Sequence, residues 1–372
     1  MPYYLKHHFD PDTGRRRLVP EKQADGSVDH FELNYVQNVE AGNVIAEWVE
    51  VDEEEAEKLD SRYLFEERKF PAGHGTGIKH RHPDRLYAAV NGWVGYSDGR
   101  IRVHEKLTIE KDVDYNTGNI DFIGNLTVRG CVRSGFHVGG RDVRIDGQIE
   151  GARVEALHSL SCRGGVKGSH EAFLESGKTM KLAFCENATL KAGEDVLVKG
   201  ALMHSDVYAG RRLAVGGRLT GGRIVCHEYI YVGEQLGGGL DTSTRIILGY
   251  NPTLMYADEE YNARIRLLHD RIKTYEKQMS KGPDFREEFG PKLEAAIKEL
   301  NLVKMLKVKL WEGIQGTECL DECKILVPGV VKPGVEISIG DAFLKVDDYF
   351  EDVYFYYENY EVKIGTSSKR LG

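Results

Sequence analysis

Three histidines lie close together in the segment GHGTGIKHRH, residues 73–82, and they are the first candidates for chemistry. They are His74, His80 and His82. The His-x-His spacing of the last two can place two imidazoles on one side of an extended segment, as transition-metal sites require. The same spacing is also found in exposed, glycine-rich polar loops, because short histidine spacing alone is a weak metal signature. We therefore predict no metal site and no cofactor, and keep these histidines as the candidates to test.

Six cysteines provide thiols, and none has the CxxC spacing of metal or redox motifs. They are Cys131, Cys162, Cys185, Cys226, Cys319 and Cys323. We expect Cys162 and Cys226 to pack inside the fold. Cys319 and Cys323 could face each other if that stretch were helical, but no histidine lies near them in the sequence to activate a thiolate. The first ten residues lack the apolar core of a signal peptide. We predict free thiols in a reducing, cytoplasmic compartment.

Carboxylates are the third kind of candidate, because paired carboxylates on an outer face are the catalytic groups of many carbohydrate-active enzymes. The residues expected to point outward are Asp142, Asp146, Glu150, Glu155, Glu194, Asp195 and Asp206. Outward charges are also the ordinary solvated surface of a folded chain. We predict no catalytic residues and no enzyme, and a carbohydrate- or cell-wall-active enzyme is the alternative.

Composition restricts the classes of partner. The 372-residue chain is 41% hydrophobic and has a formal net charge of -9, so it can bury a core but lacks the basic balance of a large nucleic-acid surface. No window reaches 18 apolar residues, so we expect no membrane insertion. The 42 glycines are spread along the chain, as expected for frequent turns.

The elements that must position these groups begin with an N-terminal α+β domain, predicted over residues 1–105. Residues 30–65 favour strands followed by a short acidic helix from about Asp52. Residues 85–115 favour short strands with turns at Asn91-Gly92 and at 97–99.

A repeat of about 17 residues follows, predicted over 106–250. The first apolar column is Leu126, Val143, Leu160, Met180, Val196, Leu213 and Ile230. A second column, six residues later, is Val132, Ile149, Val166, Glu186, Leu202, Leu219 and Leu236. A third column is His137, Val154, Leu174, Leu190, Val207 and Ile224, and a small residue two positions later gives Gly139, Ala156, Ser176, Ala192, Ala209 and Cys226.

These columns predict a mainly β fold, a right-handed parallel β-helix. Strands this short bury no apolar face alone, but stacked copies form a continuous core. In the stretch RDVRIDGQIEGARVEA, residues 141–156, we expect Ile145 to point inward and Gly147 to turn a corner. The strict hexapeptide pattern of left-handed β-helices is absent. An antiparallel sandwich is the alternative fold, but it requires no such columns.

The period changes after residue 250. Apolar residues of a helix, predicted within 251–313, have heptad spacing: Leu254, Tyr261, Ile265, Leu268, Ile272, Tyr275 and Met279. SKGPD at 280–284 interrupts it, and a second helix is predicted from about Phe285 to Trp311. We expect an inserted antiparallel helical hairpin, a coiled coil, that pairs with itself or with another chain. Residues 314–372 are expected to resume the β-helix and cap its open end.

Several long segments resemble the flagellar assembly protein A family. They are DVDYNTGNIDFIGNLTVRGCVRSGFHV (112–138), AFCENATLKAGEDVLVKGALMHSDVYAG (183–210), LTGGRIVCHEYIYV (219–232) and CKILVPGVVKPGVEISIG (323–340). Residues 25–47 are similar to the start of that family. The resemblance implies a cytoplasmic bacterial protein with a β-helix core, related in style to the polymer-forming bactofilins, and a role in flagellar assembly or placement. It transfers no catalytic residue.

The sequence thus predicts a non-enzymatic scaffold or assembly factor. It is expected to act through self-association, by β-helix ends or by the helical hairpin, and through protein partners. No nucleic acid is expected among them.

Overall fold

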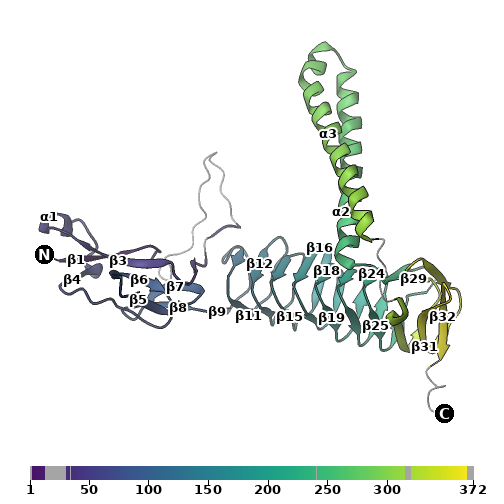
Figure 1. Cartoon of the computed structure of the whole chain (residues 1–372), viewed down its shortest axis with the longest axis horizontal. Helices are drawn as coiled ribbons and strands as arrows, with labels where there is room; N and C mark the ends of the chain where they lie inside the picture. Colours follow the sequence, from purple (N-terminus) through teal and green to yellow (C-terminus); the bar gives the residue numbers. More distant parts are fainter. Residues whose placement is uncertain (1, 13–30, 34, 240, 315–319, 367–372) are drawn as a thin grey trace. The chain divides into compact units, whose positions relative to one another are not determined.

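The computed structural model describes residues 2–12, 31–33, 35–239, 241–314 and 320–366 (Figure 1). The chain divides into two compact units, residues 1–189 and residues 190–372, and each is described by itself. Strands dominate both units. The long helices of the described chain are α2, Pro252–Met279, and α3, Pro283–Ile314.

The first unit begins with two small antiparallel sheets. One has the strand order β4-β1-β3-β6-β5 and the other β2-β7-β8. Their bounds are β1 Tyr3–His7, β2 Asn38–Val39, β3 Val44–Glu50, β4 Leu64–Phe65, β5 Thr76–Lys79, β6 His82–Ala88, β7 Gly92–Ser97 and β8 Arg100–His104. Buried residues such as Leu5, Ile45 and Leu86 form their core.

The helical content of this N-terminal region is small. The acidic helix expected from Asp52 is α1, Glu53–Ala56, and the Asp52 side chain accepts a hydrogen bond from the backbone N–H of Glu55 at its start. A 3₁₀ turn, η1, follows at Ser61–Tyr63. The turn expected at 97–99 is present between β7 and β8, where Asp98 and Gly99 adopt positive φ.

The rest of the first unit is a parallel β-solenoid, seen in Figure 1 as strands stacked coil on coil. Its strands are β9 Lys106–Ile109, β10 Ile120–Asp121, β11 Asn125–Val128, β12 His137–Gly140, β13 Val143–Ile145, β14 Arg153–Ala156, β15 Leu160–Cys162, β16 Val166–Ser176 and β17 Met180–Leu182, and β18 Cys185–Ala192 contains the boundary between the units. On one face Leu126 pairs with Val143, Val143 with Leu160 and Leu160 with Met180, all in parallel register. The predicted first column is confirmed, and the antiparallel sandwich is excluded.

The third column was wrong by one residue at its start. Val138, which is fully buried, pairs with Ile120 and with Val154, whereas His137 pairs with Arg153 and is half-buried on the outside. The small residue of that coil is accordingly Gly140, not Gly139. The coils here have unequal lengths, so a constant period of 17 residues assigns the wrong residue to the column. An error of one residue moves a side chain to the other face of the strand.

A similar slip affects the second column. Val132, Ile149 and Val166 follow one another in parallel bridges, as predicted. In the following coil Cys185 is fully buried and Glu186 is not, so the inward residue is the cysteine. The coil that precedes it is lengthened by the 11-residue strand β16, which explains the shift.

The second unit contains further parallel coils, and the whole solenoid has about 8 turns. Its strands are β19 Asp195–Val198, β20 Leu202–Met203, β21 Asp206–Ala209, β22 Arg212–Val215, β23 Arg218–Thr220, β24 Gly222–Cys226, β25 Tyr229–Val232, β26 Gln235–Leu236 and β27 Thr244–Leu248. Leu213 pairs with Val196 and with Ile230, and Ile224 pairs with Val207 and with Ile246. The right-handed sense of the coil and the domain boundaries stay predictions.

The helical hairpin is inserted between two strands of this solenoid. After α3 and the 3₁₀ turn η2, Leu320–Glu322, the chain forms β28, Lys324–Val331, whose Ile325 pairs in parallel with Ile230 of β25. Strand β29, Val335–Ile339, pairs in parallel with β27. The chain therefore resumes the coil at the place where it left it.

Antiparallel strands end the second unit. They are β30 Ala342–Val346, β31 Phe350–Glu358 and β32 Glu361–Thr366. β30 pairs with β29, and β31 lies between β28 and β32. Phe355 of β31 is fully buried, so this strand pair covers apolar surface as well as the backbone of β28.

Replacing Ile145 with Asp tests the stacking register. Ile145 is fully buried and stacks between Val128 and Cys162, so an aspartate places an unpaired charge in the shared core. We expect the free energy of unfolding in urea to fall by more than about 4 kcal/mol, or the protein to aggregate. Arg144→Thr, the outward neighbour, is the control and should change it by less than about 0.5 kcal/mol. A wild-type denaturation curve for Ile145→Asp would contradict the register.

Replacing Gly147 with Ala tests the close approach of successive coils. A Cβ at this position lies 2.2 Å from the carbonyl oxygen of Gly130 in the preceding coil, so the backbone of one coil must move. We expect a loss of about 1–3 kcal/mol in a denaturant titration. Gly290→Ala in α3, where the Cβ meets nothing within 4 Å, should raise stability by up to about 1 kcal/mol. Equal stability of the two variants would exclude the steric argument.

Candidate functional site

The helical hairpin is fixed to the second unit at its root (Figure 1). Buried side chains of the solenoid and of both helices form one apolar cluster there: Tyr208, Val225, Ile247, Met255 and Ile314. Asn251 caps α2, because its side chain accepts a hydrogen bond from the backbone N–H of Thr253 at 3.0 Å. Arg223 of β24 forms an ion pair with Glu259 of α2. The root of the hairpin therefore has a defined place on the solenoid.

The two helices pack as an antiparallel pair along one apolar seam. Leu268 of α2 is buried together with Leu300 and Val303 of α3, and other residues of the predicted heptad pack against them: Tyr261, Ile265 and Ile272. Polar residues flank the seam. Arg264 pairs with Glu299, and the Lys307 ammonium lies 3.6 Å from a carboxylate oxygen of Asp258.

The opposite side of α3 carries apolar side chains that nothing in the described chain covers. We define the α3 outer face by its residues: Lys298, Leu302, Lys304, Met305, Leu306, Val308 and Lys309. Leu302, Met305 and Val308 are 54%, 60% and 64% exposed. Three apolar residues this exposed on one stretch of helix are typical of a binding surface, since the apolar residues of a single solvated helix normally face its core.

The charges of this face are all positive and unpaired. The ion pairs that the structure describes on the hairpin involve other residues, and none involves Lys298, Lys304 or Lys309. On a helical wheel of 3.6 residues per turn these lysines lie among the apolar side chains. A single heptad stripe in α2 does not predict this face of α3. The available signal was a second set of apolar residues in α3, at 302, 305, 306 and 308, outside the buried positions 300 and 303.

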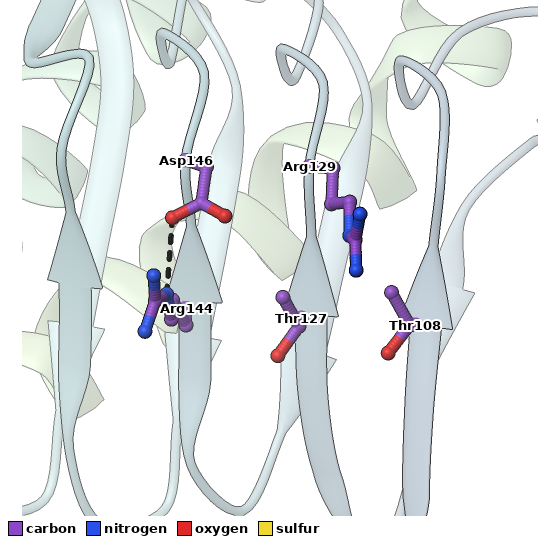
Figure 2. Close-up of a pocket in the computed structure, with 5 residues that line it drawn as sticks. All are labelled: Thr108, Thr127, Arg129, Arg144 and Asp146. Carbon is purple, nitrogen blue, oxygen red and sulfur yellow. Dashed lines mark hydrogen bonds and ion pairs between the residues drawn. The ribbon is translucent and has the colours of Figure 1, made fainter.

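The solenoid surface of the first unit is polar, and its charged side chains form ion pairs with one another. An open depression of about 370 Å³ is lined by Thr108, Thr127, Arg129, Arg144 and Asp146, whose side chains are drawn in Figure 2. Arg144 Nε donates to Asp146 Oδ1 at 3.0 Å, and Arg129 lies 3.3 Å from Glu110. Glu110 and Arg129 occupy equivalent outward positions of successive coils, and Arg144 and Asp146 are outward neighbours on one coil. Such charge pairs are expected on a solvated sheet face.

A second depression on this unit, of about 430 Å³, is lined in part by Asp121, which pairs with a residue that the sequence did not single out as a candidate. His137 Nε2 lies 2.9 Å from Oδ1 of Asp121, one coil away. This hydrogen bond raises the pKa of His137 against the opposing effect of burial, and the same bond lowers the pKa of Asp121. Asp121 and His137 lie on neighbouring coils and are 16 residues apart. A constant period of 17 residues therefore does not predict that they meet.

The candidate histidines lie on an exposed hairpin. His80 is in the turn between β5 and β6, His82 begins β6, and His74 precedes β5. All three are exposed. Within the described ranges, no three histidine, cysteine, aspartate or glutamate side chains are grouped to hold a metal ion. The structure thus offers no coordination set for these histidines.

The cysteines of the solenoid are packing residues. Cys162 and Cys226 are buried, as predicted, and burial raises the pKa of Cys162 to about 11 and that of Cys226 to about 12. Cys185 and Cys323 are also buried, whereas Cys131 is partly exposed. Cys319 lies outside the described residues.

Most of the outward carboxylates named in the sequence analysis have partners. Glu150 accepts a hydrogen bond from Arg133 at 2.6 Å, and Asp195 accepts one from Arg211 at 2.7 Å. The other partnered ones are Asp142, Asp146, Glu155 and Asp206. Pairing with arginines and backbone N–H groups is the pattern of a solvated surface.

The solenoid strands, the inserted hairpin and the antiparallel end are all found in one known protein family. Residues 105–362 match the family described as the flagellar assembly protein A β-solenoid domain. The chain belongs to this family. The match begins one residue before β9 and ends within β32, so it includes the solenoid, the hairpin and the antiparallel end. Residues 25–47 lie outside it.

Two further comparisons add nothing to the family assignment, because neither the curated proteins nor the solved structures gave a match. The described helices of this family member include none that is long and apolar enough to cross a membrane.

Thiol labelling tests the assignment of the cysteines. In a Cys319→Ser background at pH 8, we expect an aromatic disulfide reagent to modify Cys131 at least about tenfold faster than Cys162 or Cys226, since the buried thiols are protonated and inaccessible. Mass spectrometry of digested protein reports each site. In denaturant all of them should react alike. Rapid labelling of Cys226 in folded protein would contradict its place in the core.

Proposed function

We propose that this protein is a non-enzymatic scaffold of flagellar assembly that binds protein partners, including itself, through its helical hairpin. The family assignment supports the flagellar role. The observation that carries the docking role is the α3 outer face, where Leu302, Met305 and Val308 are more than half exposed. Exposed apolar side chains gathered on one helix indicate a binding surface. Burying each of them against a partner contributes roughly 1 kcal/mol or more to binding.

The fixed root of the hairpin supports the same role. Because α2 and α3 pack on the solenoid through Met255 and Ile314, the root does not have to be ordered when a partner binds, and less conformational entropy is lost. The solenoid then acts as the platform that fixes the position of the arm.

The chemistry of the remaining surface supports a role without catalysis. The thiols of Cys162 and Cys226 are buried with raised pKa values, and carboxylates such as Glu150 and Asp195 are held by arginines. We propose that the protein acts in the cytoplasm, where free thiols persist, and that neither nucleic acid nor membrane insertion is part of its function.

A chromosomal substitution tests the docking role. Cells of the source bacterium in which Leu302 and Met305 are both replaced with Glu should have fewer or misplaced flagella, counted by electron microscopy, because two charges disrupt the apolar contact. The protein should accumulate and melt as the wild type does, since both side chains are exposed.

Leu157→Glu is the matched control. Leu157 is 71% exposed on the solenoid, and this variant should leave flagella unchanged. Normal flagella in the Leu302→Glu, Met305→Glu strain, at wild-type protein levels, would exclude the α3 outer face as the docking surface.

A further inference from the structure

The antiparallel end of the second unit carries a second unpartnered surface, and its charge is opposite to that of the α3 outer face. We define the acidic cap by its residues: Phe343, Asp347, Asp348, Tyr349 and Glu351. Its carboxylates follow β30 and begin β31. Phe343 is 62% exposed and Tyr349 is 67% exposed.

The carboxylates of the acidic cap are unpaired. The ion pair that the structure describes on these strands joins Lys363 to Glu358. Asp347, Asp348 and Glu351 form no ion pair or hydrogen bond through their side chains in the described part of the chain. Exposed Lys345 lies between Phe343 and Asp347, so the three carboxylates leave the cap with a net negative charge beside its exposed aromatic surface. The α3 outer face combines positive charge with exposed aliphatic surface.

Each set of charges lies within a short stretch of chain. From Lys298 to Lys309 the helix rises about 16 Å, at about 1.5 Å per residue. From Asp347 to Glu351 the chain reaches at most about 14 Å when extended. The three lysines and the three carboxylates are therefore each confined to one small patch.

We propose, as a deepening of the proposed function on which it rests, that the α3 outer face of one copy binds the acidic cap of a second copy. Each copy has one surface of each kind, and both are exposed within the same chain, so neither is covered by the other. The contact joins two different surfaces, and such a contact adds further copies head-to-tail unless the ring closes.

Charge disfavours a symmetric contact between two hairpins. If two hairpins paired through their α3 outer faces, Lys298, Lys304 and Lys309 of one copy would face the same lysines of its partner, and like charges placed opposite one another disfavour association. An acidic surface of the second copy removes this repulsion and steers the encounter.

A membrane surface fits the α3 outer face less well. Helices that lie in a lipid interface separate a continuous apolar face from a basic face. Here Lys298 and Lys309 lie between Met305 and Leu302 around the helix, so inserting the apolar residues would draw ammonium groups toward the acyl chains. Carboxylates on a protein surface can form ion pairs with the same lysines.

The test is a charge exchange read by sedimentation velocity over a range of protein concentrations. We expect the full-length wild type to associate, with apparent affinity at least about tenfold weaker in 1 M salt than in 0.1 M salt because salt screens the contact. The basic-face variant is Lys298→Glu, Lys304→Glu and Lys309→Glu, and the cap variant is Asp347→Lys, Asp348→Lys and Glu351→Lys. Each alone should associate at least about tenfold more weakly.

Recovery of the complementary pairs makes the test specific. A mixture of the two variants, and a single chain carrying all six substitutions, should associate again, because each restores opposite charges across the contact. All six positions are exposed, so unchanged melting temperatures verify that the variants are folded.

The opposing outcomes are distinct. A wild type that stays monomeric, variants that associate like the wild type, or a six-substitution chain that fails to recover would each overturn the proposal. So would a monomeric wild type that binds vesicles of phosphatidylglycerol and phosphatidylcholine through these lysines. If such a monomer still requires Leu302 and Met305 for flagella, the scaffold function stands and only self-association fails. If the six-substitution chain recovers association but flagella do not depend on the α3 outer face, self-association stands and the docking role in flagellar assembly fails.

Discussion

The structure depends on the stacking of each coil on the next. Strands such as β13 and β15 are only three residues long, and an isolated strand of that length has neither enough apolar area nor enough hydrogen bonds to persist. Stacked in parallel, Val143, Leu160 and Met180 share one buried column, and every coil supplies the backbone partners of its neighbour. Stability therefore lies in the repetition of contacts between coils.

Close stacking also explains the surface chemistry. Successive coils are so near that a Cβ on Gly147 would meet the backbone of the preceding coil, and outward side chains at equivalent positions necessarily become neighbours. Arginines and carboxylates placed on such rows pair with one another, as Arg129 does with Glu110. A face of this kind is well solvated, and its paired charges leave few groups free to act on a substrate.

The hairpin is the exception to this regular surface, and the same stacking makes it possible. A parallel coil returns the chain to its starting edge, so β28 pairs with β25 after α2 and α3 as if these helices had not intervened. The insertion gives the protein a helical arm whose root is fixed by Met255 and Ile314. Its unpaired lysines and exposed aliphatic side chains distinguish α3 from the paired, polar faces of the solenoid.

The sequence by itself determined the repeat, the parallel β-helix and the inserted hairpin, because each leaves a periodic record in the chain. Apolar residues recur wherever the same coil position faces the core, as Leu126 and Val143 do, and heptad spacing marks α2. Only the tertiary structure decided the details that depend on coil length. It placed Val138 inside and His137 outside, where it meets Asp121, because turns of unequal length shift a register that a constant period cannot follow. It also decided which apolar residues of α3 remain uncovered, since exposure depends on what packs against a helix, and the pattern of one helix does not record its neighbours.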